Sequence, residues 1–174
     1  MPTDIVVRKG LNLKLTGEAV LETEGPKKSS DYSVYPSDFH GIYPKLLVKE
    51  NDLVKAGDIL FYDKNSEKVK FASPVSGKIH EIVRGERRRV LEIKIKSDGK
   101  NSYRKLSKVS NSDPTKIVDF LLDSGLWSFV KQRPYDIIAD PGSNPKEIYI
   151  SGFDSAPLSA DYDYVTAEEK KNIT

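Results

Sequence analysis

The chain has 174 residues, of which 37% are hydrophobic and 31% are charged, a balance typical of a soluble protein with a modest core. It contains no cysteine, which excludes disulfides, thiol catalysis and cysteine-ligated zinc or iron–sulfur centres within this segment. The net charge of +2 gives no general attraction for nucleic acid. No apolar run approaches the roughly 20 residues of a membrane span, and no signal peptide is expected at the N-terminus.

Residues 1–37 predict an N-terminal strand segment followed by a connection. Apolar and polar residues alternate over 11–15, which is typical of a half-buried strand. The stretch from Glu22 to Ser37 is polar and contains two prolines. We interpret it as a surface connection.

The central part of the chain carries one pattern twice. Residues 46–61 and 72–93 each place short apolar strands between polar turns, with turn residues at Asn51, Gly57 and Gly77. Asparagine and glycine are the residues that adopt a left-handed backbone most readily. The doubled pattern resembles the barrel-sandwich hybrid, a hammerhead of two interlocked β-sheets found in biotinyl and lipoyl carriers. The predicted core consists of Val48, Val54, Ile59, Leu60, Val75, Ile79, Ile82, Val90, Leu91, Ile93 and Ile95.

A carrier of this shape needs one modified lysine at the tip of the hairpin between its two halves, here between Leu60 and Pro74. Lys64 follows an aspartate, as in a lipoyl tip, but we expect it to lie too close to the first strand. Lys68 lies nearer the middle, but its neighbours do not match, and the Met-Lys-Met of a biotin site is absent. We therefore predict an exposed, unmodified hairpin, with a swinging-arm carrier as the alternative.

The most concentrated positive charge consists of Arg84, Arg87, Arg88 and Arg89. In an extended strand, Arg87 and Arg89 share one face and Arg88 takes the other. One interpretation is a solvated edge strand whose charges block pairing with other sheets. The alternative is docking on an acidic partner or on anionic lipid headgroups. Nucleic-acid binding is less favoured, because no aromatic residues interleave with the arginines.

Residues 98–174 predict a helical linker and the beginning of an α/β domain that the chain does not complete. Asp113 is an N-cap, with Pro114 at the first helical position. The apolar face contains Ile117, Phe120 and Leu121, and Gly125 ends the helix.

Further along, Leu126–Val130 predicts a short helical turn that ends by Arg133–Pro134. Glu147–Gly152 predicts a strand, and Ala167–Lys171 the start of a helix. Together with a barrel-sandwich hybrid over 38–97, the expected fold class is mixed α and β, in three segments: 1–37, 38–97 and 98–174.

No self-contained catalytic or metal site is expected. The two histidines, His40 and His80, lack the spacing of a metal site. There is no nucleophile elbow and no glycine-rich phosphate loop.

Several blocks, in order along the chain, are similar to NqrA, the A-type component of the bacterial Na⁺-translocating NADH:quinone oxidoreductase. The Ser-Gly-Leu-Trp and Arg-Pro-aromatic pair is the most specific part of the resemblance. Asn51 stands where the family has glycine, and Tyr135 where it has phenylalanine. The blocks are residues 9–13, 41–50, 71–78, 121–127, 132–135 and 153–158.

The resemblance implies a peripheral subunit, without membrane spans, on the cytoplasmic face of the bacterial inner membrane. It implies a sodium-pumping translocase that passes electrons from NADH to ubiquinone or menaquinone, and it places this component near the quinone-reduction end. Its partners are the other subunits, which hold the flavins and the iron–sulfur centre, and this segment binds no cofactor itself. Family members are longer, so we expect this chain to be an N-terminal part.

Three further expectations accompany the resemblance. Trp127 and Phe129 are interpreted as packing anchors. A quinone pocket that draws on Trp127, Phe129, Arg133 and Tyr135 is the alternative, since such pockets are apolar with a few polar groups. The C-type component of the related Rnf electron-transport complex and a carrier-like docking module remain alternative functions.

Overall fold

The structure is a computed structural model that divides the chain into two compact units. The main unit is Lys27–Asn144, and the second unit combines Met1–Pro26 with Pro145–Thr174. The residues that the structure describes are 9, 16, 20–22, 25, 29–107, 113–152, 154, 156 and 159–167. The predicted strand over 11–15 lies outside the described residues.

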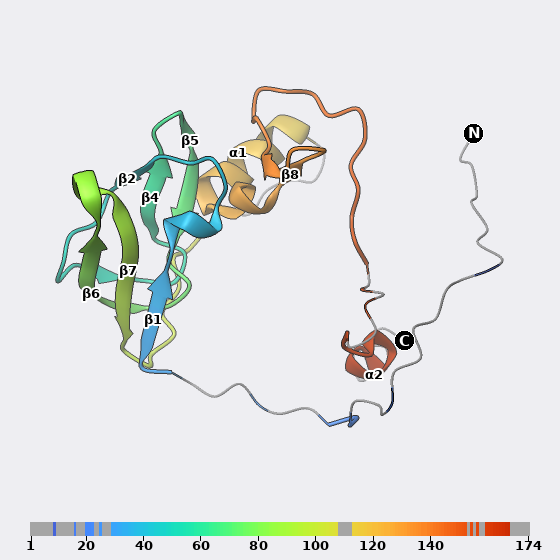
Figure 1. The fold of residues 1–174 in the computed structure, drawn as a ribbon, viewed down its shortest axis with the longest axis horizontal. Coiled ribbons are helices and arrows are strands. Elements are labelled where there is room, and N and C mark those ends of the chain that lie inside the picture. The colour runs from blue at the N-terminus through green and yellow to red at the C-terminus, as the bar shows by residue number, and fades with distance from the viewer. Residues whose placement is uncertain are drawn as a thin grey trace. The chain divides into compact units, whose positions relative to one another are not determined.

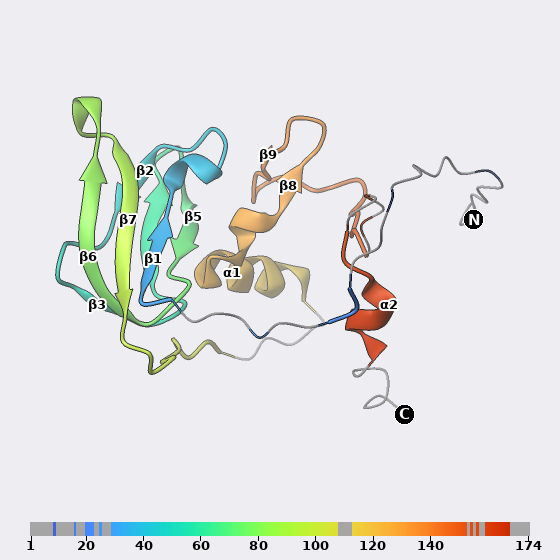
Figure 2. The ribbon, with the colours of Figure 1, turned by 60° about the horizontal axis from the view of Figure 1, so that its bottom comes forward.

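Among the described residues of the main unit, two small antiparallel sheets form the body (Figures 1 and 2). Hydrogen-bonded pairing gives the orders β1-β7-β6-β3 and β2-β4-β5. The first sheet contains β1 (Asp31–Val34), β7 (Val90–Ser97), β6 (Gly77–Arg84) and β3 (Leu53–Val54). The second contains β2 (Pro44–Leu46), β4 (Ile59–Asp63) and β5 (Ser66–Ala72). A 3₁₀ turn, η1 (Pro36–Asp38), follows β1.

The core lies between the two sheets and agrees with most of the predicted residues. Val54, Leu60, Ile79, Val90, Ile93 and Ile95 are buried, and Val48, Ile59, Val75 and Ile82 are half-buried. The prediction missed Phe61, Val69, Phe71 and Leu122, which are buried as well.

Two phenylalanines stack at the centre of this core. Phe61 and Phe71 pair across β4 and β5, and their ring centroids are 4.5 Å apart. The ring of Phe39 meets the edge of Phe71, also at 4.5 Å. These contacts fix the register of the second sheet, since offset and edge-to-face aromatic pairs are favourable beyond their buried area.

The prediction that Leu91 lies in the core was wrong, because its side chain is 43% exposed. The pairing of β6 with β7 shifts register between Val83 and Arg84, which pair with Glu92 and Val90. This irregularity leaves Leu91 without a partner in the ladder and breaks the alternation of inward and outward side chains. Leu91 therefore points outward although Val90 and Ile93 are buried.

The predicted surface connection from Glu22 to Ser37 also contains a strand. β1 pairs with β7, with Tyr32 opposite Ile95 and Val34 opposite Ile93. Tyr32 and Val34 are half-buried while Asp31 and Ser33 are exposed. The alternation of only four residues, next to a polar segment, is too short to predict a strand.

The chain after β7 is bound to the sheets as a strap, which we define as residues 98–104. The buried hydroxyl of Ser76 donates to the carboxylate of Asp98 at 2.7 Å and accepts from the N–H of Ser102 at 3.0 Å. Ala56 then pairs with Tyr103 in an isolated bridge. The hydrogen bond from Ser76 lowers the pKa of the Asp98 carboxyl.

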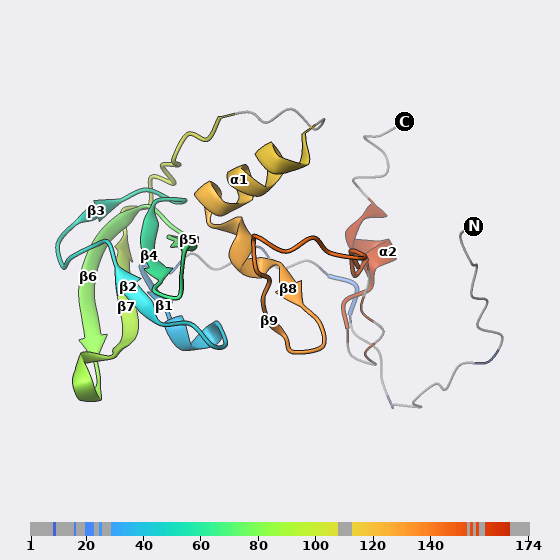
Figure 3. The same ribbon diagram turned by 90° about the horizontal axis from the view of Figure 1, so that it is seen from above.

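The predicted helix is confirmed as α1 (Pro114–Ser124), which is packed against β5 (Figure 3). The Asp113 side chain caps it by accepting from the N–H of Thr115 at 3.0 Å. Val118 and Leu122 contact the core, whereas the predicted apolar face is half-buried at Ile117, Phe120 and Leu121.

The corner after α1 requires glycine for two reasons. Gly125 has a φ of +79°, and a Cβ there would lie 3.1 Å from the Cβ of Ala72 and 3.3 Å from the carbonyl of Lys70. The predicted second turn follows as η3 (Leu126–Phe129), in which the buried Ser128 hydroxyl donates to the carbonyl of Gly125 at 2.8 Å. A hairpin of β8 (Lys131–Gln132) and β9 (Ile137–Ile138) completes the main unit.

We expect Gly125→Ala to lower the free energy of unfolding by about 1–3 kcal/mol, because alanine is strained at this φ and meets β5. Urea unfolding followed by circular dichroism measures the change. Gly142→Ala is the matched control, since its nearest contact is an Asp140 carboxylate oxygen at 3.5 Å and its φ is not left-handed. Equal stability of the two variants would contradict the role of Gly125.

The last turn of α1 is held to the body through Asp123. Its carboxylate lies 3.2 Å from Lys70 Nζ and 2.9 Å from Arg104 Nη2, and Arg104 Nη1 donates to the Asp123 carbonyl at 3.0 Å. Partial burial of Asp123 raises its pKa, but the hydrogen bonds from Lys70 and Arg104 outweigh it, and the net pKa is lowered. The ionised carboxylate therefore stabilises the folded state.

This shift has a defined pH dependence. The stabilisation by Asp123 is complete above the ordinary aspartate pKa of about 3.9 and is lost as the pH falls through the lower pKa of the folded state. We expect Asp123→Asn to be less stable than the unmodified chain at pH 7, with a difference that shrinks toward pH of about 3. Asp119→Asn, on the exposed side of α1, is the control. A difference independent of pH would contradict the ion pairs.

The second unit is described only in part. The predicted strand over Glu147–Gly152 was wrong: no strand forms there, and Ile148, Tyr149 and Ile150 are 79, 83 and 89% exposed. No described strand lies beside this segment to pair with it, and a single strand gains no ladder. A helical turn, α2, forms at Tyr162–Val165. The predicted helix at Ala167–Lys171 lies mostly outside the described residues.

Candidate functional site

The four arginines lie on the loop between β6 and β7, which we name the arginine loop (residues 84–89). The N–H of Gly85 donates to the carbonyl of Arg89 at 2.8 Å and closes the loop. Within it, η2 (Glu86–Arg88) reverses the chain, and Arg87 and Arg88 have φ values of 53° and 61°. The prediction of an extended strand with alternating faces was therefore wrong here, because the chain must turn back.

The charges of the arginine loop are open to solvent. All four arginines are exposed, and none forms an ion pair with a described carboxylate. β6 and β7 are interior strands of their sheet, so the loop protects no sheet edge. A left-handed backbone costs roughly 1–2 kcal/mol per residue without glycine, and such strain collects at functional sites. The arrangement favours docking over edge protection.

Lys64 lies at the tip of the β4–β5 hairpin, contrary to the prediction that it lies too close to the first strand. β4 ends at Asp63 and β5 begins at Ser66, so Lys64 and Asn65 form the turn. The tip is bound to its neighbour: the Lys64 N–H donates to the Tyr43 carbonyl at 2.8 Å, and the buried Asp63 accepts from the Tyr43 N–H at 2.9 Å. Lys68 is exposed within β5.

We expect the intact mass of the chain, expressed in a host with lipoylation enzymes, to equal that of the unmodified polypeptide. The hydrogen bonds to Tyr43 hold the tip against the body, where a modifying enzyme has limited access. An added lipoyl mass would contradict this prediction. Its loss in either Lys64→Arg or Lys68→Arg would then identify the modified residue.

The four residues considered for a quinone pocket have different surroundings. Trp127 is packed against the core, and its Nε1 donates to the Ala139 carbonyl at 2.8 Å, as expected of a packing anchor. Phe129 is 70% exposed and meets Phe39 by one edge, at 6.3 Å between centroids. Tyr135 is 71% exposed, and Arg133 lies 4.0 Å from Asp136. Quinone contact by these residues stays a prediction.

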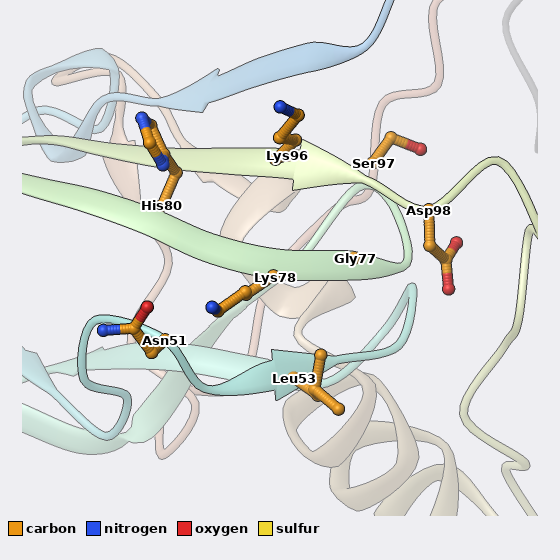
Figure 4. A pocket seen from close by; sticks show the side chains of 8 residues that line it. All are labelled: Asn51, Leu53, Gly77, Lys78, His80, Lys96, Ser97 and Asp98. Carbon is orange, nitrogen blue, oxygen red and sulfur yellow. The ribbon is translucent and has the colours of Figure 1, made fainter.

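A groove for which the sequence contains no signal lies on the first sheet (Figure 4). Its volume is about 360 Å³. The side chains of Lys78, His80 and Lys96 reach it from β6 and β7, and Leu53 from β3. Asn51, Gly77, Ser97 and Asp98 complete the lining. The register that brings these residues together cannot be read from the spacing of the residues alone.

Two searches of the described residues concern metals and membranes. No group of three or more described histidine, aspartate and glutamate side chains is placed to hold a metal ion. In the same part of the chain, no helix has the length and the apolar character needed to cross a bilayer.

The fold places the main unit in the class of barrel-sandwich hybrid proteins. Comparison with known families agrees: residues 5–98 match the family model described as the NqrA N-terminal barrel-sandwich hybrid domain, and residues 112–174 match the NqrA second alpha/beta domain. The chain belongs to the NqrA family. This confirms the predicted fold class and favours the family over the Rnf alternative.

Similar proteins are named as the A component of the Na(+)-translocating NADH-quinone reductase. The one from Marinomonas sp. (strain MWYL1) is 37% identical over 169 residues, which is 94% of this chain. Those from Saccharophagus degradans and Pseudomonas aeruginosa (strain PAO1) are 36 and 31% identical over 95% of this chain. The chain spans 38% of the length of each of these relatives.

Proposed function

We propose that this chain belongs to a peripheral subunit of a sodium-pumping NADH:quinone reductase complex and acts there as a docking scaffold. Membership in the NqrA family supports the complex, through the names of the relatives. The observation that carries the docking role is the exposed arginine loop, which forms no ion pair with a described residue. The proposed position is the quinone-reduction end, on the cytoplasmic face of the membrane.

The physical argument for docking rests on the rigidity of the loop. The Gly85–Arg89 hydrogen bond and the donation from Arg84 Nη1 to the Arg88 carbonyl at 3.3 Å hold the turn in one shape. A preformed loop loses little conformational entropy when a partner binds. Guanidinium groups suit carboxylates, to which they donate two parallel hydrogen bonds. An acidic surface of a neighbouring subunit is therefore the proposed partner.

The electron-transfer chemistry is assigned to other parts of the complex. We propose that the flavins and the iron–sulfur centre lie in partner subunits, and that this segment binds none of them. The absence of cysteine from the sequence supports this for iron–sulfur ligation. Quinone is the substrate of the complex in this proposal.

The test is the triple variant Arg87→Glu, Arg88→Glu, Arg89→Glu in the full-length protein. We expect recovery of the membrane subunits with the tagged full-length protein to fall at least about tenfold, because attraction becomes repulsion at the interface. Thermal unfolding of the isolated chain should change little, since all three side chains are exposed.

The control reverses three exposed lysines elsewhere, Lys49, Lys55 and Lys64, with the same change in net charge. Unchanged recovery in the arginine variant would remove the docking role of the loop. Equal losses in both variants would show a general effect of charge rather than a specific contact.

A further inference from the structure

Two lysines face each other across the β6–β7 pair, in the groove of Figure 4. The register places Lys78 directly opposite Lys96, and opposed residues of an antiparallel pair have Cβ atoms about 4.5–5.5 Å apart. Like charges at this position are destabilising. Among the described residues, neither lysine forms an ion pair. The described part of the chain therefore keeps an unfavourable pair without a counter-charge.

The carboxylates nearest in the structure are engaged elsewhere. Asp98 lines the groove, but its carboxylate accepts from the Ser76 hydroxyl and the Lys100 N–H, at 2.7 and 2.9 Å. Asp31 is opposite Lys96 on β1, and its carboxylate accepts from the Ser30 hydroxyl.

The same ribbon shows that compensation is available to a lysine there. Lys94, two residues before Lys96 on β7, lies 2.8 Å from the carboxylate of Glu81. The missing counter-charge at Lys78 and Lys96 is thus a local feature of the groove, not of the whole sheet.

A β-bulge adds a third donor to this place. Ile79 pairs with Ile95 and Glu81 with Lys94, so His80 has no partner on β7. Bulges release a side chain from the ladder and redirect it, often next to binding sites. Asn51 lies across from β6 on a turn fixed by donation of its N–H to the Ile79 carbonyl at 2.8 Å. Figure 4 shows Lys78 extending toward this turn.

We propose that the groove binds a phosphate-bearing small molecule. A phosphate ester carries close to two negative charges and three acceptor oxygens, which match two ammonium groups and the neighbouring donors His80 and Asn51. The flexible stems of Lys78 and Lys96 allow both ammonium groups to reach one anion. Leu53, 82% exposed beside them, contacts the organic part of the ligand. The volume of the groove lies within the range of small-molecule sites.

The experiment follows thermal unfolding of the chain with phenyl phosphate or inorganic phosphate, against sodium chloride at equal ionic strength. A ligand of the folded state raises the unfolding temperature with concentration. We expect a rise with both phosphates, larger for phenyl phosphate. Lys96→Gln and Lys78→Gln should each weaken the affinity derived from this rise by about 10- to 100-fold. Without phosphate, both variants should be as stable as the unmodified chain or more stable.

The matched control is Lys68→Gln, which removes one exposed lysine from the other sheet and should keep the full response. An equal response in Lys96→Gln, or no response beyond that to chloride, would overturn the proposal. Binding to phosphatidate vesicles without any response to the soluble phosphates would overturn it too, in favour of a lipid surface. The result is independent of the arginine-loop test, because none of the three variants alters residues 84–89.

Discussion

The contact on which the rest of the structure depends is the burial of apolar side chains between the two small sheets. Leu60 and Phe61 from one sheet and Ile79, Ile93 and Ile95 from the other are almost completely buried. Each such side chain contributes roughly 1.5–3 kcal/mol. Neither sheet has enough strands to be stable alone. The arginine loop, the Lys64 turn and the lysine groove are all carried by strands that this core holds in place.

The elements that depend on local residues could be predicted from the sequence. Asp113, Pro114 and Gly125 determine where α1 begins and ends, and the structure has the helix between them. The sequence predicts a left-handed backbone at Asn51, in place of glycine, and its φ is 75°. In both cases the physical cause lies within a few residues of its effect.

Elements that depend on distant pairing could not be predicted. Leu91 lies outside the core because of an irregularity in pairing with β6, which its own neighbours do not reveal. The local pattern predicts a turn at Gly77. It is instead the first residue of β6, where a Cβ would lie 2.1 Å from the Lys96 carbonyl. The opposition of Lys78 and Lys96 becomes visible only with that same register.

The strap of residues 98–104 has a mechanical consequence. Its beginning is fastened through Ser76, its middle pairs with Ala56, and its last residue, Arg104, grips the far end of α1 through Asp123. Because α1 is fixed to β5 at Gly125 as well, tension applied to the chain beyond the β8–β9 hairpin passes directly into the sheets. The main unit therefore transmits force as one solid piece, without a hinge at the junction of sheet and helix.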